Sequence, residues 1–128
     1  MSWYLTIRAD PEYSRFEAST RLLEFFCALP ELRQTAPVAF ESVPGVPWVV
    51  VFLAAYDSHG SYTTDGSLIP QVNVVELICS SSGDPAWFET LAGRIAALLS
   101  WAAFEDHEDR HVWPHDRPSP GVAAAQDV

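Results

Sequence analysis

Two histidines near the carboxyl end of the chain, His107 and His111, lie four positions apart, and Glu108 follows the first of them. On an α-helix, histidines with this spacing lie on one face and can bind a zinc ion, while the glutamate activates a water molecule bound to the metal. The spacing therefore offers one chemical hypothesis, in which the chain is a small metal-dependent hydrolase.

Residues 107–111 resemble the metal-binding helix of the zincin metallopeptidases over these five positions, but they depart from that pattern. Asp109 and Arg110 are both charged, whereas the family's helix is usually buried and uncharged there, and Pro114 would end the helix soon after His111. A third ligand would have to come from His115, Asp116 or Glu105. We therefore predict no bound metal and no cofactor, and interpret the segment as a charged helix end that faces water.

Two further groups of residues have types suited to acid–base chemistry. Asp57, His59 and Asp65 share one polar stretch and could form a carboxylate–histidine site, although the same residue types are common in any long hairpin loop. Glu76 interrupts the apolar residues 72–80. An inward-facing glutamate would be a buried carboxylate with a raised pKa, and hence a candidate site, whereas an outward-facing one would be an ordinary exposed residue. We favour the outward orientation.

The charge of the chain limits its partners. The 128 residues include 17 acidic side chains and seven basic ones, all of them arginines, for a net charge of −10. Nucleic acids and anionic membranes bind basic surfaces, so both are excluded as partners. An acidic field attracts a basic protein and speeds the encounter, although acidity also serves solubility. The longest apolar run, residues 48–56, is too short to span a bilayer, and no secretory signal is recognisable, so we expect a cytoplasmic location.

Cysteine and tryptophan residues add two expectations. Cys27 and Cys79 are the only cysteines, and in the cytoplasm we expect both to be reduced and buried as small apolar residues. Five tryptophans are many for this length. Trp87 is adjacent to Phe88 at the start of a predicted helix, so the two rings cannot both enter the same core. Because tryptophan is enriched at interface hot spots, Trp87 is our first candidate for an exposed partner contact.

Two segments have the signals of helices. Ser14 and Glu17 match a capping box, which would start a helix that ends before Pro30. Asp84 followed by Pro85 matches the start of a second helix. The predicted buried residues of the second helix are Phe88, Leu91, Ile95, Leu98, Leu99 and Ala102.

Other segments have the alternation or the apolar, β-branched composition of strands. They are residues 3–9, 37–43, 48–56, 72–80 and, more briefly, 111–113. We expect 37–43 to be an edge strand and 48–56 to be a central strand that is buried on both faces.

The order of these elements predicts a single α+β domain over residues 1–114. Its antiparallel or mixed sheet would have four to five strands with two helices on one face, as a ferredoxin-like variant. Residues 115–128, rich in proline and alanine, should form a disordered tail. The second face of the sheet must meet either solvent or a partner, and the apolar strand 48–56 favours a docked protein or a homodimer.

Three runs, Trp-Val-Val-Val at 48–51, Gln-Val-Asn-Val-Val-Glu at 71–76 and Val-Trp-Pro at 112–114, are similar to the small immunity proteins of bacterial secreted-toxin systems. The resemblance covers most of the folded chain without a specific motif or subfamily. It implies a non-catalytic protein that binds and neutralises a toxin made by the same cell, and the acidity agrees because many such toxins are basic nucleases. A structural or oligomeric domain remains the alternative to this function and to the hydrolase. The residues predicted to bind the partner are Trp87, Asp57, Asp65, Glu105, Asp106, Glu108 and Asp109.

Overall fold

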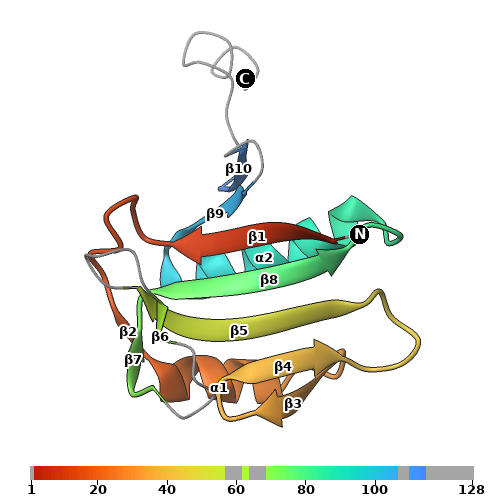
Figure 1. Ribbon diagram of the computed structural model, residues 1–128, viewed down its shortest axis with the longest axis horizontal. Coiled ribbons are helices and arrows are strands. Elements are labelled where there is room, and N and C mark those ends of the chain that lie inside the picture. The colour runs from red at the N-terminus through yellow and green to blue at the C-terminus, as the bar shows by residue number, and fades with distance from the viewer. Residues whose placement is uncertain (1, 57–61, 64–68, 107–109, 115–128) are drawn as a thin grey trace, which may run out of the picture.

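The computed structural model describes residues 2–56, 62–63, 69–106 and 110–114 (Figure 1). Two α-helices are present in these residues, α1 (Ser19–Cys27) and α2 (Pro85–Leu99). The strands are β1 (Ser2–Arg8), β2 (Glu17–Ala18), β3 (Leu32–Ala36), β4 (Ala39–Ser42), β5 (Val49–Tyr56), β6 (Tyr62–Thr63), β7 (Gln71–Val72), β8 (Val74–Ser80), β9 (Ala102–Glu105) and β10 (Arg110–Trp113). The predicted tail, residues 115–128, lies outside the described residues.

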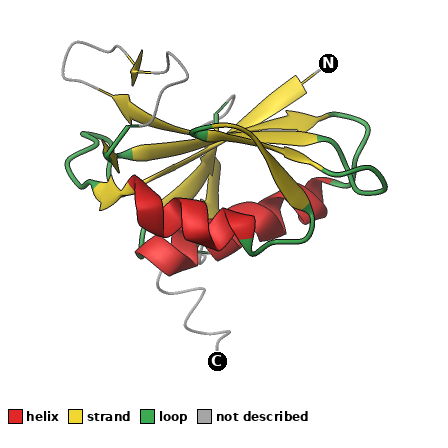
Figure 2. Cartoon of the chain, turned by 90° about the horizontal axis from the view of Figure 1, so that it is seen from below, coloured by secondary structure: helices red, strands yellow, loops and turns green. Residues whose placement is uncertain are grey.

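The main sheet has the strand order β10-β9-β1-β8-β5-β4-β3, with β6 added beside β5, and each pair of neighbours is antiparallel. A separate short ladder joins β2 to β7. Both helices pack on one face of the main sheet (Figure 2). The predicted α+β class, the antiparallel sheet and the two helices on one face are confirmed. The predicted number of four to five strands is wrong, because seven strands follow one another across the sheet.

The hydrophobic core fills the space between the sheet and the helices. Successive side chains of a strand point to opposite faces, so alternate residues of β1, β5 and β8 enter this layer. Phe26 from α1 and Phe88 from α2 meet them, and both rings are fully buried. The fully buried strand residues on this side include Leu5, Ile7, Phe40, Val49, Val51, Leu53, Val75, Leu77 and Cys79.

The start of α1 differs from the capping-box prediction. The carboxylate of Asp10 accepts hydrogen bonds from the amide and the hydroxyl of Ser14, so Ser14 is already used in a turn. Glu17 belongs to β2, and its carboxylate lies 3.2 Å from Arg21. The helix begins two residues later, at Ser19, without a side-chain cap. Its end before Pro30 agrees with the prediction.

The end of α2 also differs from the prediction, whereas its start is confirmed by the Asp84 side chain, which accepts a hydrogen bond from the Ala86 amide. Ser100 adopts a left-handed conformation with φ 59°, and the Trp101 amide donates to the Ala96 carbonyl at 2.9 Å. This arrangement ends the helix and turns the chain into β9. Ala102 therefore lies in β9, and the expected helix end is wrong at Arg110 and His111, which lie in β10, while residues 107–109 lie outside the described residues.

The strands on the β3 side of the sheet correct two further expectations. The predicted strand 37–43 contains β4, which is not an edge strand because β3 pairs along its outer side. In β5, Val49, Val51 and Leu53 are fully buried, but Val50 and Phe52 on the opposite face are only half-buried. The expectation that β5 is buried on both faces is therefore wrong.

The two cysteines occupy contrasting places. Cys79 is fully buried in β8, and burial raises the pKa of its thiol to about 12. Cys27 is the last residue of α1 and is exposed, so the expectation that it is buried is wrong. Neither forms a disulfide in the described part of the chain. Neither α1 nor α2 is long and apolar enough to cross a membrane.

Candidate functional site

The sheet has a second face, which we call the open face, that points away from both helices. It is turned toward the viewer in Figure 1, and no described helix lies over it in Figure 2. Directly opposed residues of antiparallel strands share a face, so the register identifies its members. They are Arg33, Ala39, Glu41, Val50, Phe52, Glu76, Ile78, Tyr4, Thr6, Arg8, Phe104 and His111. Trp48 joins them through its hydrogen bond to Glu41.

One row of opposed residues crosses the centre of the open face. It runs from His111 through Phe104, Thr6 and Glu76 to Phe52. Glu76 is only 5% exposed and Thr6 only 4%, although no described helix covers them. Glu76 faces away from the helices, as the preferred expectation had it, but the expectation that it is exposed is wrong. A buried carboxylate at the centre of a face with aromatic neighbours is the alternative that made this residue a site candidate.

A hydroxyl group joins two acidic side chains at this point. The Thr6 hydroxyl lies 2.9 Å from the Oε1 atom of Glu76 and is also hydrogen-bonded to Oδ1 of Asp106. Asp106 follows β9 and is exposed, and its amide donates to the Tyr4 carbonyl at 3.0 Å. Thr6 thus holds one buried and one exposed carboxylate of the open face.

The predicted acidic cluster does not form one surface. Asp106 lies on the open face, but Glu105, the preceding residue, is only 8% exposed and is paired with Leu5 on the side of the helices. Neighbouring strand residues point to opposite faces, which separates the two carboxylates. Glu108 and Asp109 lie outside the described residues, as do Asp57, His59 and Asp65.

Aromatic rings of the open face contact one arginine, Arg8, which lies between Phe104 of β9 and Tyr13. The Arg8 guanidinium lies 4.8 Å from the ring centre of Phe104 and 5.4 Å from that of Tyr13. His111 stacks on Phe104 with ring centres 5.0 Å apart, and Tyr13 packs on Tyr56 at 4.2 Å. These contacts are of the cation–π and aromatic type, and they fix the rings in place.

Asn73 explains how Tyr13, which precedes the first helix, comes to lie beside β5. The Asn73 side chain is almost fully buried, and its oxygen accepts the Tyr56 amide at 2.7 Å. Its nitrogen donates to the carbonyls of Tyr13 and Tyr56 at 3.1 and 2.9 Å. We did not single out this residue in the sequence. An asparagine within an apolar strand segment is the signal that could have identified it.

Two large aromatic side chains of the open face are close to half-exposed, and each has a carboxylate beside it. Tyr4 is 45% exposed and lies next to Asp106. Trp48 is 43% exposed, and its indole nitrogen donates to Glu41 at 2.9 Å. Neither residue was among the predicted contact residues. The sequence signal is the alternation of side chains along a strand: Tyr4 and Trp48 each precede a core residue, Leu5 and Val49, and therefore point to the opposite face.

Trp87, the first candidate for an exposed partner contact, is only partly exposed. It lies on α2, in the helix layer rather than on the open face. Phe88 takes the core position, and Trp87 is half-buried with its ring 5.3 Å from that of Phe88. The sequence correctly required one ring to leave the core, but neighbouring apolar residues still cover part of it.

The metal-binding alternative lacks its helix at the residue that the structure describes. His111 lies in β10, which pairs with β9, and its Nε2 atom is 3.0 Å from the Trp113 carbonyl oxygen. His107 and Glu108 lie outside the described residues. Among residues 2–56, 62–63, 69–106 and 110–114, no three histidine, cysteine or acidic side chains form a group that could hold a metal ion.

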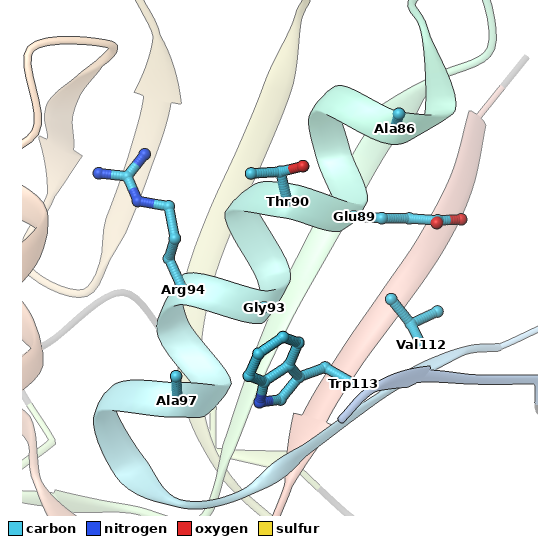
Figure 3. Close-up of a pocket in the computed structure, with 8 residues that line it drawn as sticks. All are labelled: Ala86, Glu89, Thr90, Gly93, Arg94, Ala97, Val112 and Trp113. Atoms are coloured by element: carbon cyan, nitrogen blue, oxygen red, sulfur yellow. The ribbon is translucent and has the colours of Figure 1, made fainter. Parts of the chain in front are cut away.

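A surface hollow of about 370 Å³ lies between α2 and β10 (Figure 3). Its apolar part is formed by the Trp113 ring and by small residues of the helix, including Gly93, where a Cβ atom would come 3.2 Å from that ring. The charged groups at its rim already have partners, since Glu89 binds Arg110 at 2.9 Å and Arg94 binds Glu31 at 3.2 Å. These groups stabilise the helix layer and do not converge on a shared point in the hollow.

Comparisons of the chain with protein-family models, with curated proteins and with solved structures find no match.

Proposed function

We propose that this chain is a non-catalytic protein-binding domain that receives a basic partner protein on the open face of its sheet. The observation that carries the proposal is the pair of near half-exposed aromatic residues, Tyr4 and Trp48, on a sheet face that no described helix covers. Exposed aromatic residues on a rigid, largely apolar surface are typical anchors of protein interfaces.

The charges of the chain favour a basic partner over a second copy. Within the described residues, Arg21, Arg33, Arg94 and Arg110 each form an ion pair with a glutamate. Their positive charge is therefore offset locally, and the chain as a whole keeps a net charge of −10. Two copies would repel each other, whereas a basic surface would be attracted.

The similarity to immunity proteins supplies the class of partner. In this proposal the partner is a toxin made by the same cell, and the chain neutralises it in the cytoplasm by covering a surface that the toxin needs. The order β9-β1-β8-β5, with α1 after β1 and α2 after β8, supports a ferredoxin-like core. The β3–β4 hairpin and β10 would extend that core at its two edges.

The test is to produce the chain together with the protein encoded by the adjacent reading frame. We expect a complex whose association rate falls steeply as salt is raised, because charge steering is screened. Trp48→Ala should speed dissociation and cost on the order of 2 kcal/mol of binding free energy. Phe16→Ala is the matched control, since Phe16 is 52% exposed and lies outside the strands of the main sheet.

Three results would count against the proposal. The absence of a complex would leave a structural domain as the better account. A salt-independent association would remove the argument from charge. A stable homodimer with Trp48 at its interface would assign the open face to a second copy.

A further inference from the structure

We infer that the partner inserts an arginine side chain between Tyr4 and Asp106 on the open face. This inference rests on the proposed function, and it names the chemical group that the surface recognises. It depends on the relative positions of the two side chains, on their exposure, and on how the chain already holds its own arginines.

Tyr4 and Asp106 are neighbours across the sheet. The register pairs Thr6 with Phe104 and Leu5 with Glu105, so the next opposed positions are Tyr4 and Asp106. The 3.0 Å hydrogen bond from the Asp106 amide to the Tyr4 carbonyl confirms this continuation. Both side chains therefore leave the same face of the sheet, and both are exposed.

An aromatic ring beside a carboxylate suits a guanidinium group. The planar guanidinium can stack on the ring while two of its N–H groups donate to the carboxylate. A lysine ammonium group is a point charge and cannot stack in this way. The pair therefore selects arginine over lysine as well as positive over negative charge.

The open face already holds two of the chain's own arginines, one beside a carboxylate and one over an aromatic ring. Arg33 lies 3.9 Å from one oxygen of Glu41, whose other oxygen accepts the Trp48 indole hydrogen bond. The Arg8 guanidinium lies over the Phe104 ring. Tyr4 and Asp106 place a ring and a carboxylate side by side, as Trp48 and Glu41 do, and within the described residues neither has an ion pair or ring contact with an arginine.

Thr6 adds a reason for a cationic donor at this point. A hydroxyl has one proton, so Thr6 can donate to Glu76 or to Asp106 but not to both at once. An arriving guanidinium supplies further N–H donors to the exposed oxygens of Asp106. Glu76, behind Thr6, adds a second acidic group near the arginine.

The inference can be tested with two peptides of equal charge, octa-arginine and octa-lysine, added to the isotopically labelled full chain. We expect octa-arginine to bind more tightly and to shift the amide resonances of Tyr4, Thr6, Phe104 and Asp106. Asp106→Asn should weaken octa-arginine binding about tenfold, which corresponds to about 1.4 kcal/mol. The matched control is Glu24→Gln, which removes the same charge from an exposed position on α1 and should change binding less than about twofold at physiological salt.

Tyr4→Leu removes the aromatic ring but keeps an apolar side chain, so it tests whether stacking on the ring is needed. It should reduce the preference for octa-arginine over octa-lysine while thermal unfolding shows that the variant is folded. Equal binding of the two peptides, or equal effects of Asp106→Asn and Glu24→Gln, would overturn the inference. If the chain still bound the protein from the adjacent reading frame, the proposed function would stand without the arginine site. If octa-arginine were still preferred but no protein partner bound, the arginine site would stand and the proposed function would be wrong.

Discussion

The two faces of the main sheet use the same strands for different purposes. In β8, Leu77 and Glu76 are consecutive and both are buried, but Leu77 enters the core under the helices and Glu76 lies on the open face. In the core layer the large aromatic residues Phe26, Phe40 and Phe88 are fully buried, whereas Tyr4 and Trp48 on the open face are close to half-exposed. The comparison shows that the apolar content of a strand does not indicate which of its side chains stabilise the fold.

The largest expected difference between the faces is in stability. Phe88→Ala removes a fully buried ring from the core and should lower the free energy of unfolding by about 3–5 kcal/mol. Trp48→Ala removes a ring that is 43% exposed and should cost less than about 1 kcal/mol. Urea denaturation of the two variants measures both values. Similar losses would mean that Trp48 supports the fold, and the distinction between the two faces would fail.

A smaller effect concerns the buried carboxylate of the open face. Glu76→Ala removes an acceptor of the Thr6 hydroxyl and should cost about 1–3 kcal/mol, whereas Glu76→Gln keeps an acceptor and should cost less. Thermal unfolding with Glu24→Ala as the exposed control tests this. A more stable Glu76→Ala variant would contradict the expectation and show that the carboxylate is kept at the expense of stability.

The smallest effect on stability is expected from the ionisation of Cys79 in the core layer, because it appears only at alkaline pH. Burial raises the pKa of its thiol from 9.0 to about 12, so the folded state holds this proton more tightly than the unfolded state does. The resulting stability is fully present below pH 9 and is lost as the pH rises from 9 toward 12, by up to about 1.4 kcal/mol per pH unit.

Melting temperatures at pH 8 and pH 10 test this expectation, and Cys79→Ala should remove part of the alkaline loss. A thiol reagent should modify the exposed Cys27 in the folded protein and Cys79 only after unfolding. Rapid modification of both thiols would show that the core layer opens to solvent.

The parts of the fold that the sequence predicted are those decided by local signals. Asp84 and Pro85 mark the start of α2, and the β-branched run of β5 identifies that strand. The end of α2 was missed because a serine, Ser100, takes the left-handed position that glycine usually occupies. β3 was missed because Arg33 and its two following residues are polar and exposed at the edge of the sheet.

The residues of the open face were harder to predict than the helices and strands, because their neighbours are set by the register between strands that are distant in the sequence. Whether Glu76 is buried is decided by Phe52 and Thr6, which come from strands far away in the sequence. The acidic pair Glu105 and Asp106 looks like one patch in the sequence, but strand alternation divides it between the two faces. Composition predicts that a protein partner would be basic, whereas the position of the proposed contact surface required the strand pairing.

The central position of β1 has a consequence for the order in which the chain can fold during synthesis. Thr6 bonds to residues 70 and 100 positions later, so β1 leaves the ribosome before either of its neighbours is available. At about 5–20 residues per second, the wait for Asp106 is on the order of 5–20 s. The β3–β4–β5 part of the sheet can form meanwhile from local contacts, and β1 is expected to insert between β8 and β9 last.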